Sequence, residues 1–197
     1  MLLVFGAVGA TADRDDNNSP SAQSAQVEAI EPEAKDAVGL LEESRGPGDA
    51  LPNEFKARMD EKADFGLNPD LSRRAIGNMT SSVYVIPARA HICASLTDSE
   101  GATVICPSTD EVAEGKSGPA TVALDTGGVA IFGIVPDGVD SVSVQTGISD
   151  SVDVATEDNA YYTVLPPGTQ LRSVSYVGPS GPVEFPIYDP VAVFEDS

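Results

Sequence analysis

The sequence lacks most of the groups on which enzymes and nucleic-acid-binding proteins rely. It has no tryptophan, one histidine and two cysteines, and its 11 lysine and arginine residues stand against 31 aspartate and glutamate residues. The formal net charge of −20 repels phosphate backbones, which excludes nucleic acid as an expected partner. Because there is a single histidine, any Ser-His-Asp or Cys-His mechanism has to use His91.

Long hydrophobic runs are also lacking, so we expect no transmembrane span. The apolar segment at residues 1–12 is too short to cross a bilayer, which takes about 20 residues. It ends in Ala10-Thr11-Ala12, the small-x-small pattern of a signal-peptidase site, although the usual basic start is missing. We therefore predict a signal-peptide-like segment cleaved after Ala12 and an extracellular or cell-envelope location.

Two further parts precede the main domain. Residues 13–31 are rich in Asp, Asn, Ser and Gln, so they predict a disordered acidic linker. Residues 32–77 predict a small helical segment. One helix begins at Pro32, and a second runs from about Pro52 to Asp64.

The end of the helical segment predicts one more short turn. Asp70 is expected to cap a single helical turn from Leu71 to Ile76, which Gly77 ends. All of these helices are short and have narrow apolar faces. They either pack on the following domain or fold only in part.

From Ser82 onward the apolar period changes from that of helices to that of strands. Val83 and Val85 alternate with Ser82 and Tyr84, and turn signals recur about every 8 to 12 residues to the end of the chain. The pattern predicts an all-β domain at residues 82–197. We expect a β-sandwich or small barrel of about eight to ten short antiparallel strands, which folds without the preceding helical segment.

The centre of this domain is the sequence GVAIFGIVPDGVDSVSV, from Gly128 to Val144. Its apolar run is typical of a strand buried on both faces, and Pro136-Asp137-Gly138 is typical of a turn. The alternation after the turn indicates a strand with one wet face. We expect the two strands to pair as a β-hairpin.

The two cysteines are predicted to form a disulfide. If residue 94 faces residue 105 and residue 96 faces residue 103 in a hairpin, Cys93 lies directly opposite Cys106. In a chain with an export-like start, such a pair is typical of a disulfide. The alternatives are two buried thiols, or a redox or metal site in which His91 takes part.

The cysteine pair, the segment GIVPDGV from Gly133 to Val139, and Asp158-Asn159-Ala160-Tyr161 carry a resemblance. Together they resemble a group of uncharacterised exported β-domain proteins of high-GC bacteria, over about the last 110 residues. The resembling residues are turn and strand residues. The resemblance implies export and a β domain, and it implies no activity.

Carboxylates supply the remaining candidates for a site. Five aspartates in or near the turns of the β domain are candidate calcium ligands: Asp137, Asp140, Asp150, Asp153 and Asp158. None has the spacing of a formed calcium loop, so turn residues are the competing interpretation. His91 is the one candidate catalytic residue, and a hydrogen-bonded histidine at a strand end is its alternative.

The sequence favours a non-catalytic role without a cofactor. We predict an exported binding or structural module at the cell surface, with a protein or glycan as its ligand. The two alternatives are a secreted hydrolase centred on His91 and a calcium-dependent adhesion module.

Overall fold

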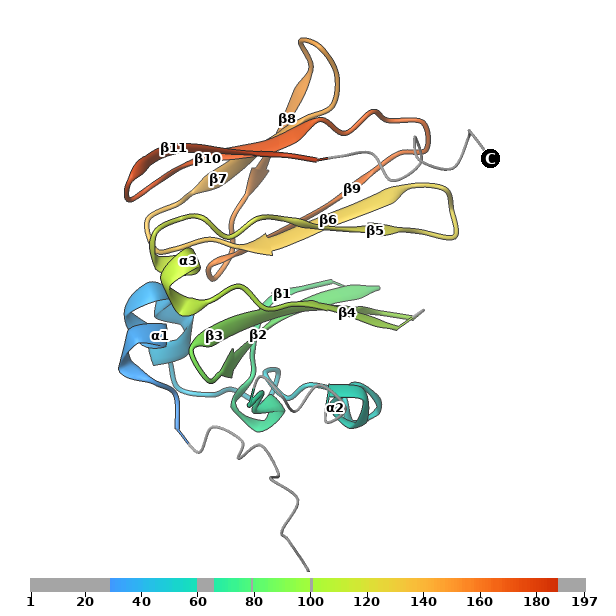
Figure 1. Cartoon of the computed structure of the whole chain (residues 1–197). Coiled ribbons are helices and arrows are strands. Elements are labelled where there is room, and N and C mark those ends of the chain that lie inside the picture. The colour runs from blue at the N-terminus through green and yellow to red at the C-terminus, as the bar shows by residue number, and fades with distance from the viewer. Residues whose placement is uncertain (1–28, 60–65, 79, 100, 188–197) are drawn as a thin grey trace, which may run out of the picture.

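Three antiparallel β-sheets make up most of the molecule. The computed structural model describes residues 29–59, 66–78, 80–99 and 101–187. Figure 1 shows the sheets as stacked layers, with helices α1 and α3 at one end of the stack and α2 beneath it. The described strands close no barrel, and the predicted mostly-β fold with a short helical segment is confirmed.

Each sheet has a simple order of strands. The first sheet has the order β1 (Arg73–Gly77), β2 (Ser81–Ala88), β3 (His91–Asp98), β4 (Ala102–Ile105). The middle sheet has the order β5 (Ala120–Ala123), β6 (Val129–Ile134), β9 (Ala160–Leu165). The third sheet has the order β11 (Gly181–Pro186), β10 (Ser173–Gly178), β7 (Ser141–Gln145), β8 (Ser151–Ala155). The helices are α1 (Pro32–Ala37), η1 (Gly39–Glu42), α2 (Asn53–Met59), η3 (Pro69–Leu71) and α3 (Thr109–Ala113).

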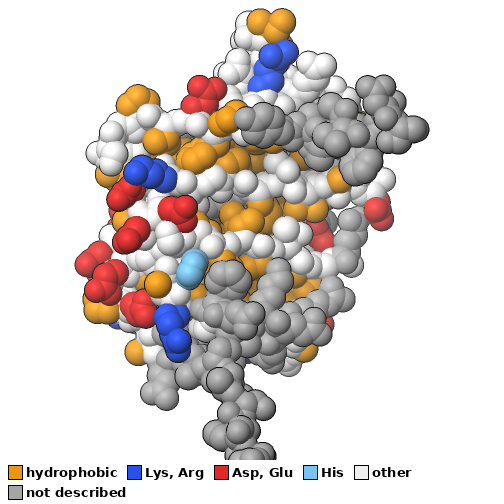
Figure 2. Space-filling model, in the orientation of Figure 1, with side chains coloured by type: hydrophobic (Ala, Val, Ile, Leu, Met, Phe, Trp, Pro, Cys, Tyr) orange, Lys and Arg blue, Asp and Glu red, His pale blue; other side chains and the backbone are white. Residues whose placement is uncertain are grey.

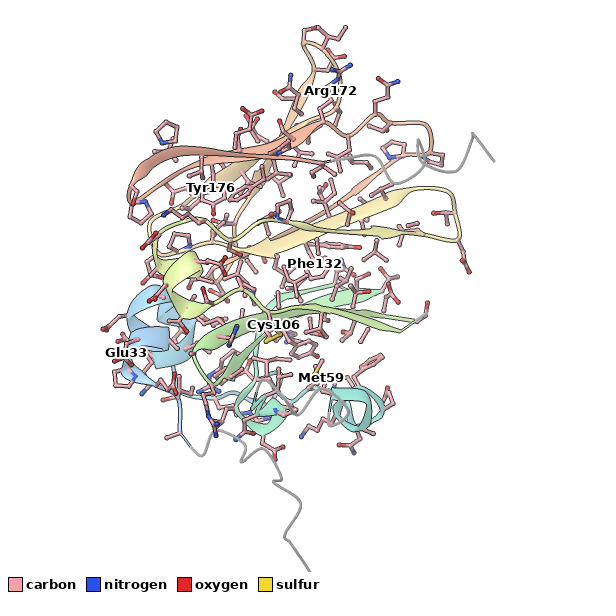
Figure 3. All side chains as sticks on the ribbon, viewed as in Figure 1. Glu33, Met59, Cys106, Phe132, Arg172 and Tyr176 are labelled. Carbon is pink, nitrogen blue, oxygen red and sulfur yellow. A yellow bond between two sulfur atoms is a disulfide. The ribbon has the colours of Figure 1, made fainter. Side chains whose placement is uncertain are left out.

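The middle sheet is buried on both faces, and β6 at its centre explains the unbroken apolar run. Phe132 and Ile134 point into an apolar layer shared with the first sheet, whereas Ile131 points into a second layer shared with the third sheet. Figure 3 shows Phe132 between the first and middle sheets. Each fully buried side chain of this kind contributes about 1.5–3 kcal/mol. The prediction of a strand buried on both faces is confirmed.

The predicted hairpin between residues 128 and 144 is wrong. β6 pairs with β5 and β9, whereas β7 pairs with β8 and β10 in a different sheet. The Pro136-Asp137-Gly138 turn, with Gly138 at φ 82°, therefore carries the chain from the middle to the third sheet. Two strands with apolar faces gain more burial by packing face to face than by pairing edge to edge.

Gly133 interrupts the apolar run because a tyrosine ring occupies the space above it. Gly133 lies opposite Tyr161 of β9, and a Cβ atom at this position would lie 2.6 Å from the Tyr161 hydroxyl oxygen. Tyr161 is only 1% exposed. The glycine therefore makes room for an aromatic ring on the neighbouring strand.

The helical segment packs on the sheets. Helix α1 begins at Pro32 as predicted, and Ala34, Ala37, Val38 and Leu41 are buried in the layer between the first and middle sheets. This segment thus completes the core of the β domain. Residues 82–197 lack part of that core when taken alone.

The predicted helical turn from Leu71 to Ile76 is wrong. Asn68, and not Asp70, caps a shorter turn, η3, by accepting a hydrogen bond from the Asp70 amide. Residues 73–77 then form β1, an edge strand of the first sheet that pairs with β2. Pairing along β2 buries Ala75, which a single exposed helical turn could not do.

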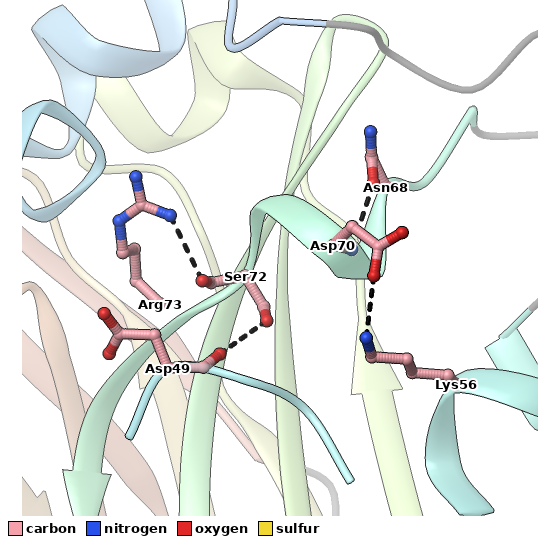
Figure 4. A network of polar contacts seen from close by, with 6 residues as sticks. All are labelled: Asp49, Lys56, Asn68, Asp70, Ser72 and Arg73. Carbon is pink, nitrogen blue, oxygen red and sulfur yellow. Dashed lines mark hydrogen bonds and ion pairs between the residues drawn. The ribbon is translucent and has the colours of Figure 1, made fainter. Parts of the chain in front are cut away.

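A buried arginine ties β1 to the segment before it. Arg73 is 7% exposed, and its guanidinium donates to the carbonyl oxygens of Glu43, Leu71 and Ser72 at 3.0–3.2 Å. The Ser72 hydroxyl donates to the Asp49 carbonyl oxygen at 2.7 Å (Figure 4). A buried charge is tolerated only when hydrogen bonds replace its water, and backbone carbonyls do so here.

The same region is fixed at the surface by an ion pair. Lys56 of α2 donates to Asp70 at 2.7 Å (Figure 4). This hydrogen bond and the lysine charge hold the pKa of the Asp70 carboxyl below its usual range. Because the Asp70 side chain is exposed, the pair orients α2 more than it stabilises the fold.

Strands β8 and β11 are the two edges of the third sheet. Pro186 lies in β11, where a proline is tolerated because an edge strand has one unpaired side. In the described residues, no helix is both long enough and apolar enough to cross a membrane.

Candidate functional site

The predicted disulfide is present. Ala94 pairs with Ile105 and Leu96 pairs with Thr103, so β3 and β4 bring Cys93 opposite Cys106, and their sulfur atoms are bonded. Cys93 is fully buried on the outer face of the first sheet. The bridge uses both cysteines, which leaves no free thiol in the chain as a nucleophile or metal ligand.

His91 lies at the start of β3, beside helix α3. Its Nδ1 donates to the Arg89 carbonyl oxygen at 2.7 Å, and its backbone is bridged to Ser108. A histidine, a serine and a carboxylate, Glu111, thus lie close together, as the hydrolase hypothesis requires. The hydrogen bonds among the three side chains show whether they are arranged as a catalytic relay or as a helix cap.

The Ser108 hydroxyl belongs to a helix cap. It donates to the Glu111 carboxylate at 2.9 Å and accepts from the Glu111 amide at 3.2 Å, which makes a capping box at the start of α3. Hydrogen bonds from the Ser108 amide and hydroxyl lower the pKa of Glu111, and Glu111 is exposed. In a Ser-His-carboxylate relay the imidazole lies between the other two groups, whereas here serine and carboxylate bond directly.

Asp137, one of the candidate calcium ligands, accepts hydrogen bonds from distant parts of the chain. Its Oδ1 accepts from the Gly39 amide at 2.9 Å and from the Asn159 side chain at 2.7 Å. Asn159 in turn accepts from the Leu40 amide at 3.2 Å. The two side chains satisfy the first amides of η1 and join the helical segment to the turn after β6.

The other candidate calcium ligands do not converge. Asp140, Asp150 and Asp153 lie on separate exposed positions around the β7–β8 hairpin. Asp158 and Asn159, with φ of 47° and 64°, form the tight turn before β9. Among the described residues, no group of three or more His, Cys, Asp or Glu side chains is placed to hold a metal ion.

A polar pocket of about 190 Å³ lies on the outer face of the first sheet, beside α2. Ser82, Tyr84 and Thr97 come from paired β2 and β3 and share this outer face. The remaining lining residues come from α2 and the residue before it, the β1–β2 connection and the strand ends: Pro52, Phe55, Asn78, Thr80, Ser81 and Asp98. The pocket is open to solvent.

Two hydroxyls in this pocket have no partner among the described residues. The Thr97 hydroxyl donates to the Ser82 carbonyl oxygen at 3.3 Å, and Asn78 accepts from the Thr80 and Ser81 amides. The side chains of Ser82 and Tyr84 form no such bond. They present donors and acceptors beside the half-buried Phe55 ring.

No sequence pattern predicts this pocket as a whole, although one signal for it is present. The alternation of Ser82 and Tyr84 with valines indicates a polar outer face on β2. Phe55 lies almost 30 residues earlier in the sequence. It lines the pocket only because α2 packs against this face of the sheet. No local pattern contains that information.

Two tyrosines between the middle and third sheets differ in their partners. The Tyr176 hydroxyl donates to the Gly115 carbonyl oxygen at 3.0 Å, whereas the buried Tyr161 hydroxyl has no partner in the described part of the chain. Burial raises the pKa of Tyr176 to about 12 and that of Tyr161 further. Both rings belong to the core and face no pocket given by the structure.

Comparison of the chain with protein-family models, with curated proteins and with solved structures gives no match. The resemblance to exported β-domain proteins of high-GC bacteria therefore stays a prediction, and function has to be argued from this geometry alone.

Proposed function

We propose that the chain is a non-catalytic binding module of the cell exterior, which holds one sugar ring in the pocket beside α2. The pocket carries this proposal because two uncommitted hydroxyls, of Ser82 and Tyr84, lie there beside the aromatic ring of Phe55. A sugar ring offers the matching groups on one small molecule. Its hydroxyls bond polar side chains, and its C–H face packs on an aromatic ring.

The size and charge of the pocket restrict the class of sugar that it can bind. A volume of about 190 Å³ is below that of drug-sized sites, so the pocket fits a single ring at the end of a glycan. Asp98 in the lining of the pocket and the net charge of −20 disfavour acidic sugars. A ligand of this size is expected to bind with a dissociation constant on the order of 0.1–1 mM.

The disulfide supports a location outside the cytoplasm. Bonds such as Cys93–Cys106 persist in oxidising compartments and are rare in reducing ones. The predicted cleavage after Ala12 lies outside the described residues and stays a prediction. Mass spectrometry of the native protein should give Asp13 as its first residue.

The sugar proposal is tested by NMR titration of the full chain. The probes are the methyl glycosides of glucose, mannose, galactose and N-acetylglucosamine. At least one should shift the amide signals of Ser82, Tyr84 and Thr97 in a saturable way. Absence of saturable shifts in these residues with all four probes contradicts the proposal.

Matched variants separate the pocket from the rest of the surface. Tyr84→Phe and Ser82→Ala each remove one uncommitted hydroxyl and should weaken binding by about three- to tenfold, the worth of one hydrogen bond. Ser151→Ala removes an exposed hydroxyl on β8 and should leave the affinity unchanged. Equal effects of all three variants would locate the binding outside the pocket.

A further inference from the structure

Strand β8 is the most exposed sheet edge among the described strands. Four of its five residues, Ser151 to Ala155, are exposed. The other edge strands have two exposed residues of five in β1, none of four in β4, one of four in β5, one of six in β9 and three of six in β11. In β11 the edge is also protected by Pro182 and Pro186. Strand β8 contains no proline, lysine or bulge. It has none of those protections.

The backbone of β8 offers a regular row of hydrogen-bonding groups. Thr146 donates to the Asp150 carbonyl and Thr156 donates to the Asp140 carbonyl, which fixes the alternation of the β7–β8 ladder. In this register Val152 and Val154 bond β7, and residues 151, 153 and 155 turn their N–H and C=O groups to the open side. These groups have no backbone partner among the described residues.

Along β8 the valine side chains point to one face of the sheet, and Ser151, Asp153 and Ala155 point to the other. Val154 is buried in the layer below the third sheet, and Val152, on the same face, remains 43% exposed at the end of that layer. At the hairpin tip Ile148 is 85% exposed. Figure 1 shows this hairpin extending beyond the rest of the third sheet, and Figure 2 shows apolar surface at the tip.

The outer face of the edge is acidic. Asp153 lies on it, and Asp150, Glu157 and Asp158 flank the strand, all exposed and with no lysine or arginine in residues 150–158. The Arg172 backbone donates to the Gln145 carbonyl of β7, on the side of β7 away from the open edge of β8.

The geometry points to β8 as a docking strand for an extended peptide segment of a partner protein. The segment pairs antiparallel or parallel with β8 and has basic residues at alternate positions. Its basic side chains face Asp153 on the outer face, and its apolar side chains cover Val152 and extend the buried layer. A second copy of the chain is a poorer occupant, because symmetric pairing about Asp153 sets identical carboxylates against each other.

Fluorescence anisotropy of a labelled peptide with alternating lysine and valine, Lys-Val repeated four times, tests this inference on the full chain. The peptide should bind at low salt and more weakly at high salt. A peptide of the same length with alternating lysine and proline cannot form the ladder and should bind at least about tenfold more weakly. Equal binding of the two peptides would mean simple attraction between opposite charges and would overturn the inference.

Two substitutions at one position separate backbone pairing from charge. Asp153→Pro blocks the open edge but removes only an N–H that points away from β7, whereas Asp153→Asn removes the same charge and keeps that N–H. Asp153→Pro should weaken binding at least about tenfold and Asp153→Asn only about two- to threefold. Equal losses in the two variants overturn the inference.

NMR hydrogen exchange on the unmodified chain covers the case in which Asp153→Pro fails to fold. Bound peptide should protect the amides of Ser151, Asp153 and Ala155 and leave those of β11 unchanged. Protection elsewhere, or peptide-independent dimerisation measured by light scattering, contradicts the inference. Because the pocket lies on the first sheet, a failed sugar titration does not affect this result.

Discussion

The first and third sheets pack on opposite faces of the same middle sheet, yet they differ on their outer sides. The outer face of the first sheet presents Tyr84, Ile86 and Cys93, and a third apolar layer with Leu51 and Met59 covers it. The outer face of the third sheet carries a row of small polar and acidic side chains across four strands: Glu184, Ser175, Ser143 and Asp153. Water can therefore solvate the outer face of the third sheet, whereas the apolar outer face of the first sheet has to be covered by protein.

The two sheets also differ in how they are held in place. In the first sheet a disulfide joins β3 to the residue after β4, a buried arginine joins β1 to the segment before it, and the helical segment packs against the sheet, which also lines the pocket. The third sheet is joined to the rest by the apolar layer below it, and β8 is its most exposed edge. Substitutions that remove links of the first sheet should therefore destabilise the protein most.

Deleting residues 1–79 should have the largest effect. The deletion removes β1 and the buried side chains of α1 and η1, so residues 80–197 should show no cooperative thermal transition by circular dichroism. A chain that begins at Ala29 keeps every contact described above and should melt cooperatively. A sharp transition in residues 80–197 would confirm instead the prediction that the β domain folds alone.

Reduction of the disulfide should come next. The Cys93–Cys106 bridge has a sequence separation of 13, for which chain-entropy arguments give about 3 kcal/mol. Urea denaturation with and without a reducing agent measures the loss. The double variant Cys93→Ala, Cys106→Ala should not respond to the reducing agent, and an unchanged midpoint for the native chain would contradict the prediction.

Gly133→Ala tests the packing of the middle sheet, which contacts both the first and the third sheet. The added Cβ would lie 2.6 Å from the Tyr161 hydroxyl oxygen in a closed core, so we expect a loss of about 1–3 kcal/mol in unfolding free energy. Gly118→Ala is the matched control, because its Cβ would meet Phe185 at an ordinary 3.5 Å. Equal effects in urea denaturation would mean that the ring moves aside freely.

Alkaline pH should weaken the layer below the third sheet. An unfolded tyrosine loses its proton near pH 10, whereas burial raises the pKa of Tyr176 to about 12 and that of Tyr161 further. The unfolded state therefore binds fewer protons above pH 10, so stability is complete below that pH and falls as pH rises. Tyr161 alone accounts for up to about 1.4 kcal/mol per pH unit. A pH series of urea denaturations measures this slope, which Tyr161→Phe should reduce.

The smallest effect expected is a difference between two similar substitutions. Tyr176→Phe removes the hydrogen bond to the Gly115 carbonyl and should cost about 1 kcal/mol at neutral pH. Tyr161→Phe removes a buried hydroxyl for which the described residues give no partner, and it should be neutral or stabilising. Thermal melts of both variants measure the difference. The reverse order would indicate a buried water at Tyr161.

The sequence by itself determined what depends on near neighbours in the chain. The Cys93–Cys106 pairing follows from the register of one hairpin, and the start of α1 follows from a proline at position 32. The turn with a left-handed glycine at 138 was equally local. Strand period and turn chemistry encode such features directly, which is why the fold class was predicted correctly.

Only the tertiary structure decided which faces meet. β6 and β7 are adjacent in sequence but lie in different sheets, and residues 73–77 form a strand because β2 is there to pair with them. The hydrogen bond from the Gly39 amide to the Asp137 carboxylate joins residues 98 apart in the sequence, which no local pattern predicts. The pocket likewise needs α2 beside β2 and β3. These contacts form because the stacked layers together remove apolar area from water. That total area depends on all segments at once, so no single segment of the sequence predicts it.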